Sequence, residues 1–328
     1  MTTTSTSEPV RVISGPKITA AQRERLELAG GNVVMDDAAS PANQERVLGV
    51  AGSVEVWFGP GLTPEVLAVA KELKWLQADG VGVDHYLFPE LIASTVTVVP
   101  IRYRHATTAD HALAMVLALA RAMPQLMRQQ SLRSWQPPEP SEVIALDGTA
   151  LVVIGTGQIG SAVATRATSF GMVADGVSRT GQARRPFRHI YQSGQLADAV
   201  RDATFVVNTL PLTPDTAGLV SRTVLETMKP GAVFINVGRG GTVDQSALID
   251  CLRSGHLRAA GLDVFSEEPL PPGSELWDLP NVILTPHCAG VVPGMQPSQL
   301  GVESLAENLM RYRRSEPLLV PVDKAGGY

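Results

Sequence analysis

The sequence predicts an α/β fold built from two doubly wound parallel β-sheets. Short β-rich segments alternate with helical segments through most of the chain, which is the pattern of βαβ units around a parallel sheet. The chain has 328 residues, 44% hydrophobic and 18% charged, which suits two globular domains of ordinary size. A proline-rich stretch, residues 136–140, separates an early series of alternating segments from a later series.

Each of the two series predicts one of the two sheets. The early series has predicted strands at residues 10–14, 33–35 and 54–58, and predicted helices at 19–29, 43–50 and 64–70. The later series has predicted strands at residues 150–154, 172–177, 205–208, 233–237 and 282–284, with predicted helices at 160–169, 195–202, 222–228 and 245–254. A last apolar helical segment, residues 299–312, is expected to pack back onto the first domain, so that the chain crosses between the domains twice.

Composition and charge exclude several classes of function. The net charge is only −5 and the basic residues are scattered, which argues against nucleic acid and anionic membrane surfaces and favours a small-molecule ligand. The most apolar helical segment, residues 109–122, is shorter than the roughly 20 residues that span a bilayer, so no membrane span is expected. Residues 1–7 lack the features of a secretory signal, which predicts a cytoplasmic location.

The two cysteines, Cys251 and Cys288, lie far apart in the sequence and show no metal-ligand spacing. We therefore expect both to be reduced packing residues, and we predict no metal site.

A dinucleotide fingerprint follows the predicted strand 150–154 at once. It reads Gly155, Thr156, Gly157, Gln158, Ile159 and Gly160, and a helical pattern comes next. In this context Gly155 allows a tight turn, Gly157 lets a pyrophosphate approach the backbone, and Gly160 lets the helix pack on the strand. The N-terminus of the helix offers N–H groups and a partial positive charge to phosphates. The sequence thus predicts a Rossmann-like dinucleotide site.

The tip of the next strand distinguishes NAD from NADP, because it meets the adenosine ribose. Predicted strand 172–177 ends in Ser178 and Arg179, a small polar residue and a cation, which suit a 2′-phosphate. Asp175 lies three residues before this tip, and an odd offset along a strand puts its side chain on the opposite face. NADP(H) is therefore favoured over NAD(H). In the alternative, the strand ends early, Asp175 reaches the ribose, and Ser178 and Arg179 form an ordinary turn.

Three side chains suited to reducing a 2-keto acid follow strand-like segments of the later series. Arg239 lies where ligands of open α/β sheets bind, and a guanidinium can hold a carboxylate with two parallel hydrogen bonds. His287 is the candidate acid, because histidine holds or releases a proton near neutral pH. Glu268 is its candidate partner, since a nearby carboxylate would orient the imidazole. Singly, each would be interpreted as a solvated residue; together they predict a catalytic set.

The sequence resembles the D-isomer-specific 2-hydroxyacid dehydrogenase family over nearly the whole chain. The resemblance is carried, in order, by residues 80–84, 109–113, 155–160, 210–215, 236–240, 262–265 with 268–270, and 285–290. It implies that Arg239 binds the substrate carboxylate and carbonyl, that Glu268 supports the histidine, and that His287 is the acid and base.

The resemblance also implies further site residues and a homodimer formed largely through the cofactor domain. Backbone amides near Val81 and Gly82 would hold the substrate carboxylate. Leu210, Pro211, Val237 and Asp263 would line the nicotinamide side of the cofactor. Thr216 is assigned to the cofactor site with them.

Two positions depart from the family pattern. Asp110 stands where glutamate is usual, and Ser178 stands where aspartate is usual. The second departure resembles the NADP-preferring glyoxylate and hydroxypyruvate reductase branch. Arg102, Tyr103 and His105 either touch substrate or form a solvated hinge, and they are left out of the catalytic set.

We therefore predict an oxidoreductase that transfers a hydride between NADPH and a small 2-keto acid of the glyoxylate or hydroxypyruvate type. One alternative is an NAD-dependent phosphoglycerate or other 2-hydroxyacid dehydrogenase. The other is a dinucleotide-sensing binding protein like the family's co-repressors, because fold alone does not fix function. Residues 1–105 with 291–328 are predicted to bind substrate and residues 106–290 the dinucleotide, on either side of an active-site cleft.

Overall fold

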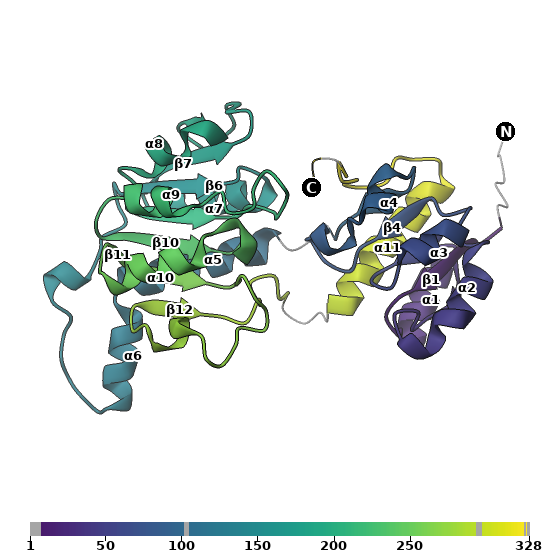
Figure 1. Ribbon diagram of the computed structural model, residues 1–328, viewed down its shortest axis with the longest axis horizontal. Coiled ribbons are helices and arrows are strands. Elements are labelled where there is room, and N and C mark those ends of the chain that lie inside the picture. The colour runs from purple at the N-terminus through teal and green to yellow at the C-terminus, as the bar shows by residue number, and fades with distance from the viewer. Residues whose placement is uncertain (1–7, 102–104, 293–296, 325, 327–328) are drawn as a thin grey trace. The chain divides into compact units, whose positions relative to one another are not determined.

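The computed structural model describes residues 8–101, 105–292, 297–324 and 326 (Figure 1). The chain forms two compact units. Unit 1 comprises residues 1–104 and 292–328, and unit 2 comprises residues 105–291. Among the described residues, no helix is both long and apolar enough to cross a membrane. The substrate-binding and dinucleotide-binding roles of the two domains, and the cleft, stay predictions.

Unit 1 is a parallel five-stranded sheet with helices on both faces. The strand order is β2-β1-β3-β4-β5. The strands are β1 (Val10–Ser14), β2 (Gly31–Met35), β3 (Val56–Phe58), β4 (Trp75–Gln77) and β5 (Thr97–Val99). The helices are α1 (Ala20–Leu28), α2 (Gln44–Ala51), α3 (Pro64–Val69), α4 (Pro89–Ala93) and α11 (Pro297–Arg313), with 3₁₀ turns η1 (Pro41–Asn43) and η2 (Asp84–Tyr86).

Alternation along the strands divides the apolar side chains of unit 1 between the two faces of the sheet. Ile13 and Trp57 belong to the core under α2, α3 and α4. Val12 and Trp75 belong to the opposite core, which also contains apolar residues of α1 and α11. The last helix thus packs on the first sheet, and it supplies Val302, Leu305, Ala306 and Leu309 to that core.

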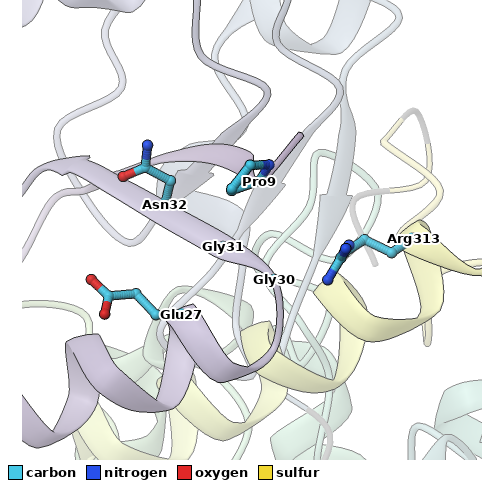
Figure 2. A pocket seen from close by; sticks show the side chains of 6 residues that line it. All are labelled: Pro9, Glu27, Gly30, Gly31, Asn32 and Arg313. Atoms are coloured by element: carbon cyan, nitrogen blue, oxygen red, sulfur yellow. The ribbon is translucent and has the colours of Figure 1, made fainter. Parts of the chain in front are cut away.

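The end of α11 fits closely against the turn between α1 and β2. A Cβ added to Gly30 would lie 2.2 Å from the Arg313 guanidinium. The two residues line a surface hollow of 360 Å³ with Pro9, Glu27, Gly31 and Asn32 (Figure 2). None of the predicted site residues lines this hollow.

Unit 2 is a parallel seven-stranded sheet in the order β12-β11-β10-β9-β6-β7-β8. The strands are β6 (Ala150–Ile154), β7 (Val173–Ser178), β8 (Ile190–Gln192), β9 (Phe205–Asn208), β10 (Ala232–Asn236), β11 (Leu257–Leu262) and β12 (Val282–Leu284). The helices are α5 (His105–Ala120), α6 (Met123–Ser131), α7 (Gln158–Ser169), α8 (Leu196–Val200), α9 (Arg222–Thr227) and α10 (Gln245–Arg253). Its 3₁₀ turns are η3 (Pro140–Glu142), η4 (Ser193–Gln195), η5 (Gly240–Thr242) and η6 (Glu275–Asp278).

Both faces of the second sheet are covered, as a parallel sheet requires. The helices α5 and α7 share one apolar core with alternate residues of the central strands, such as Val153 and Val207. The helices α8, α9 and α10 share the other core, with Val152 and Val206. The strand order reverses beside β6, whose neighbours are β7 and β9. Ligands of open α/β sheets bind at such a switch point, outside the carboxyl ends of the strands.

Candidate active site and dinucleotide site

The predicted site residues of unit 2 lie at one edge of its sheet. Because all its strands are parallel, the segments that follow their carboxyl ends meet at the same edge. The segments are residues 155–160 after β6, 178–179 at the end of β7, 210–216 after β9, 237–239 after β10, 263–268 after β11, and 285–287 after β12.

The three glycines of the fingerprint have the geometry that a dinucleotide needs. Gly155 has a φ of +98°, which only glycine adopts readily. A Cβ on Gly160 would lie 1.9 Å from the carbonyl oxygen of Gly155, so this glycine permits the close packing of α7 on the turn. A Cβ on Gly157, in contrast, would meet no atom within 4 Å. The turn is therefore closely packed at Gly160 and open at Gly157. On the open side, the pyrophosphate of a dinucleotide would lie against Thr156, Gly157 and the α7 N-terminus.

The strand β7 runs through to Ser178, and Asp175 is paired in its middle with Val152 of β6. The Asp175 carboxylate is buried and accepts hydrogen bonds from the Arg188 guanidinium and from the backbone N–H of His189, at 3.2 Å. The Asp175 carboxylate raises the pKa of Arg188 in turn. The early strand end that the alternative requires therefore disagrees with the structure.

The loop after β7 contains a cation that the sequence interpretation missed. The exposed side chain of Arg184 donates a hydrogen bond of 3.2 Å to the carbonyl oxygen of Thr156, so this cation lies against the fingerprint turn. Ser178 accepts a hydrogen bond from the N–H of Gly181 at 3.1 Å. The signal was present in the sequence as a group of four closely spaced arginines, Arg179, Arg184, Arg185 and Arg188.

His287 and Glu268 are hydrogen-bonded to each other. The distance from His287 Nδ1 to Glu268 Oε2 is 2.6 Å, and both side chains are partly exposed. The other carboxylate oxygen of Glu268 accepts the backbone N–H of Phe265 at 2.9 Å. Because Glu268 binds Nδ1, the remaining ring nitrogen of His287, Nε2, is the one left for a substrate.

The loop that carries His287 is fixed by Asp263. His287 has a φ of +51°, a left-handed conformation, and its N–H donates to the carbonyl of Asp263 at 2.9 Å. The buried carboxylate of Asp263 accepts the N–H groups of Cys288 and Ala289, both at 2.9 Å, and the hydroxyl of Thr285 at 2.5 Å. Asp263 therefore organises the histidine loop. Its predicted place beside the nicotinamide stays a prediction.

The backbone of Arg239 is fixed by hydrogen bonds. Its carbonyl oxygen accepts hydrogen bonds from the hydroxyl of Thr242, at 2.6 Å, and from the side chain of Asn236, at 3.4 Å. The glycines on either side allow close contact with the neighbouring loops. A Cβ on Gly238 would lie 2.6 Å from the carbonyl oxygen of Leu210, and one on Gly240 would lie 1.9 Å from that of Phe265. The backbone at Arg239 thus lies between the loops that follow β9 and β11, and the guanidinium of this partly buried residue donates a hydrogen bond of 3.0 Å to the carbonyl oxygen of Gly238.

The segment after β9 is shaped by its own hydrogen bonds. The Thr216 hydroxyl donates to the carbonyl oxygen of Pro211 at 2.6 Å and accepts the N–H of Thr213 at 2.8 Å. These contacts show that the Thr216 hydroxyl holds the loop, and a cofactor contact of Thr216 stays a prediction. Leu210 and Pro211 are half-buried and Val237 is buried.

In unit 1, Val81 and Gly82 lie in the turn between β4 and η2. The carbonyl of Gly80 accepts the N–H of Ile101 at 2.9 Å. The Tyr86 hydroxyl donates to Asp79 at 2.6 Å, and burial together with this carboxylate raises the pKa of Tyr86. These bonds brace the turn whose amides were predicted to hold a carboxylate. Arg102 and Tyr103 lie outside the described residues, as does the side chain of His105.

The fold and this sheet edge define a dinucleotide-binding α/β protein, and comparison with known proteins gives its family. Residues 113–289 match the NAD binding domain of the D-isomer specific 2-hydroxyacid dehydrogenases. The chain belongs to this family.

Three relatives illustrate the match. A D-3-phosphoglycerate dehydrogenase from Mycobacterium bovis is 37% identical over 225 residues, which cover 68% of this chain but only 42% of that protein. A glyoxylate/hydroxypyruvate reductase B from Serratia proteamaculans is 33% identical over 82% of this chain and 85% of its own length. The structure of an NADPH-dependent glyoxylate/hydroxypyruvate reductase from Sinorhizobium meliloti, in complex with NADP and sulfate, is 28% identical with a TM-score of 0.80, covering 97% of this chain and all of that one.

Proposed function

We propose that this protein reduces a small 2-keto acid of the glyoxylate or hydroxypyruvate type to the D-2-hydroxy acid with NADPH. The observation that carries the proposal is the contact of 2.6 Å between His287 and Glu268, at the same sheet edge as Arg239 and the dinucleotide turn. This set supplies a proton, a cation for a carboxylate, and a place for a hydride carrier. The Serratia and Sinorhizobium relatives, which are named for these two substrates, support it.

The residues have separate tasks in this reaction. The Arg239 guanidinium binds the substrate carboxylate and draws charge from the carbonyl oxygen. His287 delivers the proton from Nε2 to that oxygen, while Glu268 keeps Nδ1 protonated and stabilises the charged ring. The backbone amides of Val81 and Gly82 also bind the carboxylate. Bound NADPH supplies the hydride.

The preference for NADPH rests on the adenosine end of the site. The one carboxylate of β7, that of Asp175, is bound to Arg188 in the middle of the strand. Ser178 and Arg179 stand at the strand tip instead, and Arg184 lies against the fingerprint turn. A 2′-phosphate would find cations there and meet no carboxylate of β7.

The test is the initial rate of NADPH or NADH oxidation with glyoxylate, hydroxypyruvate, pyruvate and phenylpyruvate, each offered separately to the purified chain. We expect activity with NADPH on glyoxylate or hydroxypyruvate. Activity with NADH alone would overturn the cofactor assignment. Absence of turnover with both cofactors, together with dinucleotide binding, would favour the sensing protein over the enzyme.

A second candidate function is oxidation of 3-phosphoglycerate. It is favoured by the phosphoglycerate dehydrogenases, to which the chain is 37% identical over 225 residues. The same assay with 3-phosphoglycerate and NAD decides between the two, because turnover of this substrate in preference to the small keto acids would replace the first proposal.

We further propose that two copies of the chain pair through unit 2. Figure 1 shows α6 extending away from the seven-stranded sheet. Large apolar side chains are exposed on α6 and just beyond it, with 78% of Leu132 and 97% of Trp135 accessible. A groove of 570 Å³ lies beside Trp135. Apolar side chains gathered in this way mark a contact surface, and the family resemblance supports a second copy as the occupant.

A further inference from the structure

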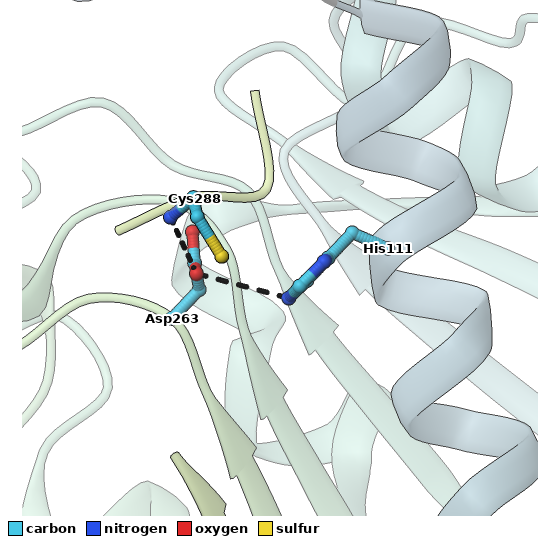
Figure 3. A group of neighbouring side chains, drawn as sticks. All are labelled: His111, Asp263 and Cys288. Atoms are coloured by element: carbon cyan, nitrogen blue, oxygen red, sulfur yellow. Dashed lines mark hydrogen bonds and ion pairs between the residues drawn. The ribbon is translucent and has the colours of Figure 1, made fainter. Parts of the chain in front are cut away.

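Three side chains of the types that bind transition metals converge beside the loop that carries His287 (Figure 3). His111 comes from α5, Asp263 follows β11, and Cys288 follows β12. One ligand atom from each lies within 4.8 Å of the other two, and His111 Nε2 is 3.7 Å from Asp263 Oδ1. A tetrahedral zinc ion with bonds of about 2.0–2.3 Å separates its ligand atoms by roughly 3.3–3.8 Å. Side-chain rotations that break the hydrogen bond of 3.0 Å between His111 Nε2 and the Thr285 hydroxyl would close the set on a cation.

The chemistry of the three groups selects the class of cation. Thiolate and imidazole are ligands for zinc, cobalt and similar ions, whereas magnesium and calcium prefer oxygen alone. One carboxylate, one thiolate and one neutral imidazole together carry the charge that neutralises a divalent cation. Three protein ligands also leave a fourth position for water, as in open zinc sites.

The Cys288 thiol is placed where a cation can replace its proton. Burial and the neighbouring Asp263 carboxylate raise the pKa of this thiol. The backbone of Cys288 is fixed by its N–H bond of 2.9 Å to Asp263. Both Cys288 and His111 are partly exposed, which leaves a route for the cation to reach the buried carboxylate.

We propose that His111, Asp263 and Cys288 form a binding site for a thiophilic divalent cation of the zinc class, and that its occupation inhibits the enzyme. On binding, the Cys288 S–H bond breaks, a sulfur–metal bond forms, and the proton passes to water. No electron is transferred. The site was hidden from the sequence because its three ligands come from separate segments and form no spacing motif.

The inhibitory effect follows from what Asp263 already does. Its Oδ1 atom accepts the Thr285 hydroxyl at 2.5 Å and the Cys288 N–H at 2.9 Å, the bonds that fix the histidine loop. A cation that takes this oxygen weakens both bonds and displaces His287 from its position. This second half of the inference rests on the proposed function, whereas metal binding itself does not.

The binding half is tested by titrating the cofactor-free full chain with Co²⁺ and recording its near-ultraviolet absorption, where cobalt–thiolate bonds absorb. We expect one Co²⁺ per chain and a cobalt–thiolate band. Cys288→Ser should abolish the band and weaken binding more than tenfold, and His111→Gln should weaken binding similarly. The matched control is Cys251→Ser, because Cys251 is the only other cysteine and lies buried in α10. It should bind like the wild type. Circular dichroism establishes that each variant is folded.

Absence of a cobalt–thiolate band in the wild type, or its survival in folded Cys288→Ser, would overturn the site. The inhibitory half is tested by adding Zn²⁺ to the NADPH oxidation assay. Wild type and Cys251→Ser should lose activity, and Cys288→Ser should resist at least tenfold more Zn²⁺. If Co²⁺ binds but Zn²⁺ leaves turnover unchanged, inhibition is wrong. If the chain shows no turnover with any substrate, the cobalt titration still decides the site, and the failure belongs to the proposed function.

Discussion

Arg188 and Asp175 form an ion pair with two hydrogen bonds beside strand β7 of unit 2. The guanidinium donates to both carboxylate oxygens, one of the bonds being 3.0 Å long. Asp175 is 5% exposed and lies three residues before the strand tip. The acidic residue of β7 is thus bound inside the protein, and the residues at the strand tip are Ser178 and Arg179.

Removing either of two arginines at or after the end of β7 should weaken the use of NADPH but not that of NADH. Arg179→Ala and Arg184→Ala should each raise the KM for NADPH about tenfold or more, because a hydrogen bond to a charged group contributes about 1.5–3 kcal/mol. The KM for NADH should stay within twofold. Arg201→Ala is the control, since Arg201 is an exposed arginine at the end of α8 and is paired with Asp198 of the same helix. Equal effects on both cofactors would place these cations outside the 2′-phosphate site.

His287→Ala should lower kcat by roughly 10²–10⁴-fold, the usual contribution of general acid catalysis. The Kd for NADPH, measured by nucleotide fluorescence, should change little because the imidazole acts on the substrate. Glu268→Gln should lower kcat less, since a neutral amide still orients Nδ1 but does not stabilise a charged ring. Near-normal turnover of His287→Ala would show that His287 is not the general acid.

The fingerprint glycines should separate binding from folding. Gly157→Ala should fold normally but weaken dinucleotide binding more than tenfold, because its Cβ enters the open space intended for the pyrophosphate. Gly160→Ala should lower stability by about 1–3 kcal/mol through overpacking, since its Cβ would lie 1.9 Å from a backbone oxygen. Gly273→Ala, where no atom lies within 4 Å, is the neutral control. Thermal unfolding and a nucleotide titration measure the two effects, and loss of folding in Gly157→Ala would contradict the assignment.

Asp244 caps the N-terminus of α10, and its side chain accepts the N–H of Ala247 at 2.9 Å. Asp244→Ala should cost about 1 kcal/mol of unfolding free energy at neutral pH. The backbone bond to Ala247 lowers the pKa of this carboxyl, so its stabilising effect is present above the usual value of 3.8 and is lost as the pH falls through the folded-state value. Urea unfolding should therefore show the difference from wild type shrinking in acid. Asp244→Asn keeps a neutral cap and should show a smaller loss at neutral pH.

The exposed apolar side chains beside α6 should be needed for self-association. Leu132→Ser with Trp135→Ser should convert a dimer to a monomer in light scattering while preserving the circular dichroism spectrum. The exposed Leu28 of unit 1, with 77% of its surface accessible, gives the control Leu28→Ser, which should leave the dimer intact. A monomeric wild type, or a double variant that still dimerises, would contradict pairing through this surface.

The alternation of β-rich and helical segments located most of both sheets, because strands of five or six residues with β-branched side chains leave a clear pattern. The strands β4, β5 and β8, of three residues each, are not among the predicted strands. The strand β11, Leu257–Leu262, is not among the predicted strands, although the sequence shows a strand-like segment before Glu268. It contains two alanines and a glycine, which are weak strand formers, and it is held in place by pairing with β10 and β12.

The site, like the fold, could be predicted only in part. The ends of strands can be recognised in a sequence, so Arg239, Glu268 and His287 could be assigned to one sheet edge. Hydrogen-bond partners that come from remote segments cannot be recognised in this way. The binding of Asp175 by Arg188, the fixing of the histidine loop by Asp263, and the approach of His111 to Cys288 all depend on how strands are ordered in space, which no local spacing encodes.

The packing of α11 on the first sheet has a consequence for biosynthesis. A ribosome completes all five strands of unit 1 early, but the helix that covers one face, with Leu305 and Leu309, emerges only after the whole of unit 2. Until then Val12 and Trp75 lack the cover that α11 supplies, although α1 is already present, so the nascent N-terminal unit exposes apolar surface that is prone to aggregation. The last helix must therefore be made before unit 1 can finish folding, so the unit whose synthesis begins first is completed last.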